Sequence, residues 1–388
     1  MKKLYILLII SIFTINVANA QWVECTNFPL SSVVYSLAIN GNNIFAGTEY
    51  NGVLLSTDNG MSWTAVNNGL PITTGFTAIA IKDSNIYVGT YEAGIYLSTN
   101  NGNSWAAIDT TNDIGSGISV HSFAIKDTNI FVAADEGVYL FSSNGKHLIK
   151  SDSGLTINEV YAIAISDSNI FAGNMGGGVY LSTNNGVSWY ASNIGLTEKI
   201  VETLFIRGTN IFAGTIVGLY LSNDNSNSWI LANHGMSTCT FHSILNYGNY
   251  LIAGTDDGVA ISSNNQIYWN LTGLSNVLSL ALKGDTIFAG TQDEGVWKRS
   301  ISEMTAGINE NTLNNISIYP NPTKDILTIE TNANQEQRLE IINLIGQTIY
   351  TIYINKKAIV NTSAFANGVY ILKIYSDKET IVRKFVKE

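Results

Sequence analysis

The feature that most constrains this chain is a short phrase that the sequence repeats five times. It reads GVLLSTDNGMSW at residues 52–63, and close copies occupy residues 94–105 and 178–189. More divergent copies follow at residues 218–229 and 258–269. Each copy is an apolar run, a polar turn rich in Asp, Asn and Gly, and an aromatic residue that starts the next apolar run. Because these turn residues supply the backbone of tight turns, each copy predicts two antiparallel strands joined by a hairpin.

A second phrase, of the form NIFAGT, precedes each hairpin, and a short apolar segment lies upstream of it again. In the first unit the four expected strands are residues 35–39, 43–48, 52–57 and 62–66. Equivalent small residues mark seven units at intervals of 36–44 residues: Gly47, Gly89, Ala133, Gly173, Gly214, Gly254 and Gly290. Seven units of about four strands, with a period near ~40 residues, are typical of a β-propeller. We therefore expect an all-β fold with a seven-bladed β-propeller.

The N-terminal segment is expected to complete the last unit. The seventh unit stops after its third strand at residues 295–301 and lacks a fourth strand of its own. The sequence QWVEC at residues 21–25 resembles that missing strand, because Trp22 falls where Trp63 falls in the first unit. Pairing this segment with the last blade would close the ring and cover edges that otherwise stay open. We expect the propeller to comprise residues 21–301.

Residues 1–20 have the pattern of a secretory signal peptide. Two lysines precede a mostly apolar run at residues 4–17, and the sequence ANA at residues 18–20 fits a cleavage site. The apolar run is too short to span a bilayer comfortably, and no other stretch approaches ~20 apolar residues. Gln21, and not a cysteine, would be the first mature residue, which disfavours a bacterial lipid anchor at that position. We expect an exported protein.

The composition suits strands and narrows the choice of partners. Charged residues make up only 13%, while Gly is abundant at 34 and Pro scarce at 4, which argues against disorder. The formal net charge is −10, and loss of the two leader lysines takes it to −12. An acidic surface repels polyphosphate and anionic lipid, so we expect neither a nucleic-acid partner nor simple electrostatic adsorption to a membrane.

The sequence indicates no metal site and no cofactor. Cys25 and Cys239 are the only cysteines, and no Cys/His spacing resembles a zinc site. In an oxidising compartment the two thiols could pair, or they could be two small buried apolar side chains, and the sequence leaves both alternatives open. No phosphate-cradling glycine loop precedes a helix, and no nucleophile elbow is present. We expect a monomer.

The S-x-D-x-G-x-x-W turn resembles the Asp-box (BNR) repeat of sialidases, sortilin-type receptors, photosystem II assembly factors and xyloglucan-active glycoside hydrolases. The resemblance covers about residues 21–301, and only the first copy keeps every position. In these families the turn stabilises the fold away from the active face, and Asp or Asn side chains are suited to bonding their own turn backbone. A structural role is therefore expected for Ser56, Asp58, Gly60, Trp63, Ser98, Gly102, Trp105, Ser182, Gly186 and Trp189.

After residue 301 the repeat stops. Residues 302–314 are polar and patternless, which predicts a linker, and residues 315–388 then read as the alternating strands of a small β-sandwich. This tail resembles the C-terminal sorting domain of the type IX (Por) secretion system of Bacteroidetes. The resemblance implies an address read by the type IX secretion machinery, and an extracellular or outer-membrane-surface location for the protein. The residues that carry it are Tyr319, Pro320, Asn321, Pro322, Gly346, Gly368, Tyr370, Lys384 and Lys387.

Candidate binding residues come from the loops that a propeller gathers on one face. The loops between second and third strands surround the mouth of the channel, and acidic residues occupy them in five of the seven units. The resulting rim candidates are Glu49, Tyr50, Tyr91, Glu92, Asp135, Glu136, Asp256, Asp257, Asp293 and Glu294. An acidic rim with two tyrosines could bind a cation, a basic protein surface or a sugar, whereas short polar loops can also simply keep a protein soluble.

A second set of candidates lies just before the small residue that opens each inner strand. The seven equivalent residues are Tyr35, Thr77, His121, Tyr161, Glu202, His242 and Leu278. Equivalent positions approach one another near the channel mouth, so Tyr35, His121, Tyr161, Glu202 and His242 are channel-mouth candidates. Such side chains can act as ligands or as acid and base, but they can equally be hydrogen-bonded packing between blades.

No complete catalytic set is evident. Sialidases hold the substrate carboxylate with three arginines, and this propeller has only Arg207 and Arg299. A glycoside hydrolase needs two carboxylates about 5–10 Å apart across a cleft, for which Asp256 or Asp257 facing Glu49 are candidates. The xyloglucan-active enzymes that the chain resembles frame their cleft with two propellers, whereas this chain has one.

These observations favour a non-catalytic, secreted or surface-displayed propeller that binds an unknown protein or polysaccharide through its acidic face. A glycoside hydrolase or lyase with two rim carboxylates is the first alternative. An assembly factor for a surface complex is the second.

Overall fold

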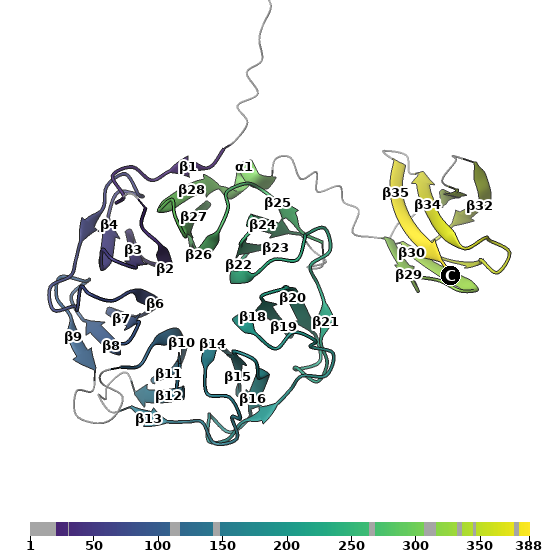
Figure 1. Cartoon of the computed structure of the whole chain (residues 1–388). Helices are drawn as coiled ribbons and strands as arrows, with labels where there is room; N and C mark the ends of the chain where they lie inside the picture. Colours follow the sequence, from purple (N-terminus) through teal and green to yellow (C-terminus); the bar gives the residue numbers. More distant parts are fainter. Residues whose placement is uncertain are drawn as a thin grey trace, which may run out of the picture. The chain divides into compact units, whose positions relative to one another are not determined.

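The chain forms two compact units, residues 1–307 and 308–388 (Figure 1). The computed structural model describes residues 21–29, 31–108, 117–142, 148–263, 268–305, 316–331, 336–343, 347–375 and 380–388. The expected signal peptide lies outside these residues, and so do residues 306–314 of the expected linker. No helix in this described part is long and apolar enough to cross a membrane.

The first unit is a ring of seven four-stranded antiparallel sheets (Figure 1), which confirms the predicted propeller. The inner strands are β2 (Val34–Asn40), β6 (Phe76–Lys82), β10 (Val120–Lys126), β14 (Val160–Ser166), β18 (Val201–Arg207), β22 (Phe241–Tyr247) and β26 (Val277–Lys283). The second strands are β3 (Asn43–Thr48), β7 (Asn85–Thr90), β11 (Asn129–Ala134), β15 (Asn169–Asn174), β19 (Asn210–Thr215), β23 (Tyr250–Thr255) and β27 (Thr286–Thr291).

The third strands are β4 (Val53–Ser56), β8 (Ile95–Ser98), β12 (Gly137–Ser142), β16 (Gly178–Ser182), β20 (Gly218–Ser222), β24 (Gly258–Ser262) and β28 (Val296–Ser300). The outer strands are β5 (Thr64–Ala65), β9 (Ala106–Ile108), β13 (Ile149–Lys150), β17 (Tyr190–Ala191), β21 (Ile230–Leu231), β25 (Asn270–Leu271) and β1 (Val23–Glu24). Outer strands are shorter than the sequence predicts, since pairing begins only after the tryptophan. We number the blades one to seven from β2 to β26.

The ring closes through the N-terminal segment, as predicted. β1 pairs with β28, with Val23 opposite Lys298 and Glu24 opposite Trp297, and the Cys25 amide donates to the Val296 carbonyl at 2.8 Å. Trp22 Nε1 donates to the Thr272 carbonyl of blade six at 3.2 Å. Four turn tryptophans, Trp105, Trp189, Trp229 and Trp269, make the same contact with the preceding blade, for example Trp229 Nε1 with the Ser192 carbonyl at 2.8 Å. Trp22 therefore occupies the place of a turn tryptophan in blade seven.

The polar turns are held by the side chains that the repeat keeps. In blade one the Gly60 amide donates to Ser56 Oγ at 2.8 Å, and the Ser62 amide donates to Asp58 Oδ1 at 2.9 Å. In blade two Asn100 takes the place of the aspartate and accepts from the Ser104 amide at 2.9 Å. Asn and Asp both provide the acceptor oxygen, which explains why the repeat tolerates either residue.

Two details of the first unit bear on sequence expectations. The segment that starts the expected linker forms a short helix, α1 (Ile301–Thr305), because Ile301 and Met304 fall on one side of it and are buried. These residues therefore pack with the propeller, and the patternless reading of residues 302–305 was wrong. Cys25 and Cys239 are both buried free thiols, and burial raises the pKa of Cys25 to about 12.

The second unit has two sheets around its own core. One sheet contains β29 (Ile316–Tyr319), β30 (Ile326–Thr331) and β33 (Lys357–Asn361). The other contains β32 (Thr348–Ile354), β31 (Gln337–Ile342), β34 (Gly368–Tyr375) and β35 (Thr380–Lys387). Buried residues of both sheets, including Leu327, Leu372 and Phe385, form one hydrophobic cluster, as expected for a small sandwich.

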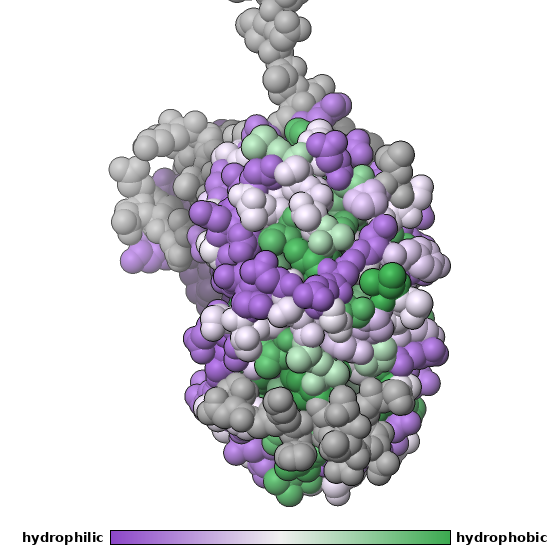
Figure 2. All heavy atoms as spheres, turned by 90° about the vertical axis from the view of Figure 1, so that its left-hand side faces the viewer, coloured by the Kyte–Doolittle hydropathy of each residue, from purple (hydrophilic) through white to green (hydrophobic). Residues whose placement is uncertain are grey.

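The outer edge of the ring has mixed polarity. Viewed from the side of β4 and β9, hydrophobic residues form patches framed by hydrophilic ones (Figure 2). This view shows side chains of both kinds reaching the surface, which is ordinary for a folded protein because apolar atoms make up much of its accessible surface.

We predict that Gly195 is required for blade contact. Its φ is +83°, and an added Cβ would overlap the Trp229 carbonyl oxygen of the next blade. Gly208 is the matched control, with φ +59° and nothing within 4 Å of an added Cβ. We expect Gly208→Ala to cost about 1 kcal/mol from backbone strain alone, and Gly195→Ala to cost clearly more in a denaturant melt. Equal losses for the two variants would contradict this role.

We also predict a pH-dependent contribution from the first turn. Hydrogen bonds from Ser62 lower the pKa of Asp58 to about 2 from its ordinary 3.8. A lowered folded-state pKa gives stability that is present above pH 3.8 and is lost as the pH falls through about 2. Asp58→Asn keeps the turn geometry seen at Asn100 but cannot titrate. The difference in melting temperature between wild type and Asp58→Asn should therefore shrink from pH 5 to pH 2, and a constant difference would refute the prediction.

Candidate functional site

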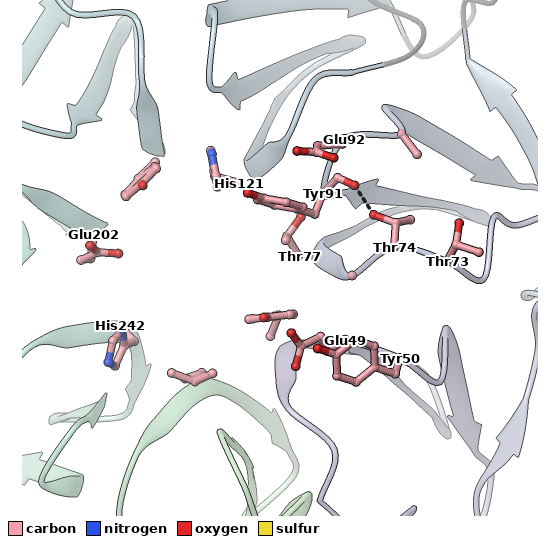
Figure 3. Close-up of a pocket in the computed structure, with 15 residues that line it drawn as sticks. Glu49, Tyr50, Thr73, Thr74, Thr77, Tyr91, Glu92, His121, Glu202 and His242 are labelled. Carbon is pink, nitrogen blue, oxygen red and sulfur yellow. Dashed lines mark hydrogen bonds between the residues drawn. The ribbon is translucent and has the colours of Figure 1, made fainter.

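A cavity of about 930 Å³ opens at one mouth of the channel (Figure 3). Every blade contributes to it, because the second residue of each inner strand lines it. These seven residues are Tyr35, Thr77, His121, Tyr161, Glu202, His242 and Leu278. The structure thus brings together all five channel-mouth candidates. Figure 3 shows Glu202 and His242 across the cavity from Tyr91, Glu92, Glu49 and Tyr50.

The same strand register recurs in every blade and determines which side chains lie next to one another at this cavity. Each inner strand has a register shift after its first residue, as between Val120 and Ser122 of β10. The second strand pairs its last residue with that first residue, for example Ala134 with Val120. As a result the second inner residue lies beside the first loop residue, fourteen positions later in the sequence. The residue at that loop position therefore determines whether the second inner residue has a hydrogen-bond partner within its own blade.

In two blades, a histidine at the inner position is paired with an aspartate at the loop position. His121 Nε2 lies 2.5 Å from Asp135 Oδ1 in blade three, and His242 Nε2 lies 2.7 Å from Asp256 Oδ1 in blade six. Burial acts to raise the pKa of Asp256, but hydrogen bonds from His242 and the Thr240 amide outweigh it and lower the pKa. Both imidazole rings are thus oriented from behind by a carboxylate.

Tyrosines occupy the same position in two other blades. A hydrogen bond to Glu49 adds to burial in raising the pKa of Tyr35. Tyr161 donates from its hydroxyl to Met175 Sδ at 2.9 Å, and its ring lies 4.4 Å from that of His121. Burial, followed by the charge of Glu202, raises the pKa of Tyr161. These phenols therefore stay neutral and present aromatic surface to the cavity.

Glu202 differs from its equivalents. The loop position fourteen residues later is Ile216, which has no polar side-chain atom. Within the described residues the Glu202 carboxylate makes no hydrogen bond and no ion pair. Burial raises its pKa, while the more distant His242 and His121 act in the opposite direction and Asp256 adds to the increase. Glu202 is therefore an inner-strand carboxylate without a partner at the loop position of its own blade.

Only four of the ten rim candidates line the cavity. Glu49, Tyr50, Tyr91 and Glu92 line the cavity. Asp135 and Asp256 lie behind the histidines, while Glu136 accepts from the Tyr139 hydroxyl at 3.4 Å and Asp257 accepts from the Ser237 hydroxyl. Asp293 and Glu294 line a separate hollow of about 350 Å³ with Glu24 and Trp297. Neither Asp256 nor Asp257 lines the cavity that Glu49 lines, and the pairing of either aspartate with Glu49 across one cleft stays a prediction.

The predicted turn residues lie on the opposite face of the ring. Third strands start at the cavity face and end in these turns, where Ser56, Ser98 and Ser182 each accept from the amide of the turn glycine at 2.8–2.9 Å. The glycines Gly60, Gly102 and Gly186 have φ between +79° and +84°. Trp105 and Trp189 donate to the preceding blade, and Trp63 packs edge-on against Phe28.

Near Asn321 and Pro322, the tail is bonded to the backbone of its last strand. Asn321 Oδ1 accepts from the Val386 amide at 2.9 Å, and the Thr323 amide donates to the Val386 carbonyl at 2.8 Å, next to Pro322. Tyr319 donates to Glu330, and Tyr370 donates to the Ala366 carbonyl. Gly368 is the first residue of β34, and Lys387 is the last residue of β35. The peptide bonds before Pro320 and Pro322 are cis. Gly346 and the side chain of Lys384 lie outside the described residues.

Sequence reasoning missed one wall of the cavity. Thr73, Thr74 and Gly75 belong to the connection between β5 and β6, and all three line the cavity. Thr74 donates to the Tyr91 carbonyl, which fixes this connection against the rim (Figure 3). The His–Asp spacing of fourteen residues was also missed, although the alignment of the repeats contained it. In the described residues no group of three His, Cys, Asp or Glu side chains is placed to hold a metal ion.

A family model identifies the tail. Residues 317–388 match the model described as a secretion system C-terminal sorting domain. The tail therefore indicates export by the type IX secretion system to the cell surface or the extracellular space, and interaction with its machinery. This confirms the resemblance read from the tail sequence.

The match to a curated protein covers a short part of the chain. The chain is 25% identical over 95 residues to an ulvan lyase, NLR42, from Nonlabens ulvanivorans. This match covers 24% of the chain and only 17% of the lyase. A likeness over so small a share of the relative carries no statement about the activity of the whole chain.

Solved structures that resemble the chain are propellers. An extracellular domain of a hybrid two component system from B. thetaiotaomicron has a TM-score of 0.61 at 17% identity, over 92% of this chain and 55% of that one. YCF48 bound to D1 peptide has a TM-score of 0.60 at 15% identity, over 74% of this chain and 97% of that one. The GH74 enzyme of Niastella koreensis has a TM-score of 0.55 at 16% identity, over 70% and 43%. At these identities the likeness shows the fold alone.

We predict that the unpaired Glu202 carboxylate costs stability. Its raised pKa means that stability is fully present below its unfolded pKa and is lost as the pH rises through the folded value. Glu202→Gln should therefore melt higher than wild type at pH 7, by about 2 °C, and the gain should fall towards zero near pH 4. Glu92→Gln, which changes an exposed carboxylate of the same cavity, is the control and should give no comparable gain. A lower melting temperature for Glu202→Gln at pH 7 would contradict the prediction.

Proposed function

We propose that this chain is an exported, non-catalytic recognition protein whose axial cavity binds a protein or glycan ligand. The observation that carries this proposal is the convergence of seven equivalent inner-strand residues on one cavity of about 930 Å³. A volume of this order suits ligand binding, for which pockets typically measure about 300–1,000 Å³. The same proposal includes removal of residues 1–20 as a signal peptide, an Asp-box-type propeller, a linker before the sorting tail, and a monomeric state.

The chemistry of the lining supports recognition. Tyr50 and Tyr91 are 75% and 53% exposed at the rim, where aromatic rings can cover a ligand. Three of the five carboxylates at or behind the lining already have partners in their own blade, as with Asp135 and Asp256. These pairs fix the orientation of the imidazole rings in the wall of the cavity.

A glycan-active enzyme is the second candidate function. Glu202 and Glu92 line the cavity without an ion-pair partner in the described residues, and burial raises the pKa of Glu202, which is what a general acid requires. The likeness in fold to a GH74 enzyme and the short match to an ulvan lyase agree with this candidate. An anionic polysaccharide is disfavoured, because the lining holds three carboxylates and neither Lys nor Arg.

The test uses the mature chain, residues 21–388, on glycan and peptide arrays, with a parallel assay for polysaccharide cleavage. We expect binding without turnover, and we expect Tyr91→Ala to lower affinity about tenfold because the cavity rim loses its aromatic surface. Tyr190→Ala is the matched control, since Tyr190 is 50% exposed on the outer strand β17.

Two results would overturn the proposal. Equal affinity for wild type and Tyr91→Ala would place the binding surface elsewhere. Polysaccharide cleavage that Glu202→Gln and Glu92→Gln abolish would replace recognition with the enzymatic candidate.

A further inference from the structure

We propose that the ligand of the axial cavity carries a guanidinium or ammonium group, as on an arginine or lysine side chain of a polypeptide, and that Glu202 is its counter-charge. This inference rests on the proposed recognition function and narrows it to a positively charged peptide. Four observations carry it: the charge of the lining, the missing partner of Glu202, the aromatic rings that line the cavity, and the use of four lining hydroxyls within the protein.

The charge of the lining is one-sided. Glu49, Glu92 and Glu202 line the cavity, and none of the lining residues is Lys or Arg. Asp135 and Asp256 add two carboxylates that contact His121 and His242. A concave surface with one sign of charge raises the local concentration of the opposite sign, so the cavity attracts cations.

Glu202 is the group that such a cation would satisfy. In blades three and six the loop aspartate and the inner histidine satisfy each other. In blade five the carboxylate is on the inner strand, and Ile216 at the loop position cannot pair with it. A partly buried carboxylate without a donor is costly, and a guanidinium or ammonium group from a ligand would remove that cost.

Aromatic rings surround the same space. Tyr35, Tyr50, Tyr91 and Tyr161 all line the cavity. Burial raises the pKa of Tyr35 and of Tyr161, and the hydrogen bond to Glu49 raises that of Tyr50, so these rings stay neutral. The face of a tyrosine ring attracts a cation, and more strongly when water is excluded. Carboxylates and aromatic rings together favour a guanidinium or an ammonium group.

The hydroxyl groups of the lining argue for a peptide over a sugar. Thr74 donates to the Tyr91 carbonyl, and Thr77 donates to the Val120 carbonyl. Tyr161 donates to Met175, and Tyr50 is bonded to Glu49. Recognition of a polyol depends on free polar groups that match its hydroxyls, and the hydroxyls of these four residues are already used. An arginine or lysine side chain needs only the carboxylate and the rings.

The experiment titrates the mature chain with two acetylated and amidated peptides, Gly-Ser-Arg-Ser-Gly and Gly-Ser-Gln-Ser-Gly, by NMR or calorimetry. We expect the arginine peptide to bind at least about tenfold more tightly than the glutamine peptide. Glu202→Gln should remove this preference. Ile216→Lys should also remove it, because the new ammonium supplies in blade five the partner that the ligand would otherwise supply.

Glu136→Gln is the matched control, because Glu136 lies in a loop of the same face but outside the cavity, and it should keep wild-type affinity. Melting temperatures of all variants separate loss of binding from loss of fold. Equal affinity of wild type and Glu202→Gln for the arginine peptide would overturn the inference, as would failure of the arginine peptide to bind wild type. Binding of a neutral oligosaccharide that Tyr91→Ala weakens would overturn it while leaving the proposed function intact.

Discussion

The whole ring depends on one close contact that recurs between neighbouring blades. A small residue in each second strand lies against the first residue of the next inner strand, so that a Cβ on Gly47 would come within 2.5 Å of the Phe76 carbonyl oxygen. The contact returns to its start at Gly290, where a Cβ would lie 2.6 Å from Val34 Cγ1. Because neighbouring sheets approach closely at this point, their inner strands converge on a channel mouth.

That convergence gives the cavity its chemistry. Strand register places the second inner residue beside a loop residue fourteen positions later. The identities of these two residues determine whether their side chains form a hydrogen bond within the blade. His121 and His242 are satisfied by aspartates, whereas Glu202 faces Ile216. Under the proposed recognition function, the unpaired Glu202 is the element that breaks the quasi-symmetry of the ring of inner-strand residues.

The tail forms the second compact unit, and its role is sorting. Its two sheets share one core, and the segment around Asn321 bonds to the backbone of the last strand at Val386. Residues that the sequence separates by more than sixty positions thereby form one end of the sorting domain. Because the two units have independent cores, substitutions in the cavity of the propeller do not alter the packing of the sorting domain.

The sequence by itself determined the architecture: the period fixed the number of blades, and Trp22 identified the closing strand, because repeated local patterns report repeated local structure. It also named the residues at the channel mouth. Only the tertiary structure decided which candidates share a cavity, that Asp257 and Glu294 do not, that Thr73 and Thr74 do, and that residues 301–305 are helical. The reason is physical: a repeat fixes the position of a residue within its blade, whereas partners and solvent access depend on packing between loops that the repeat does not constrain.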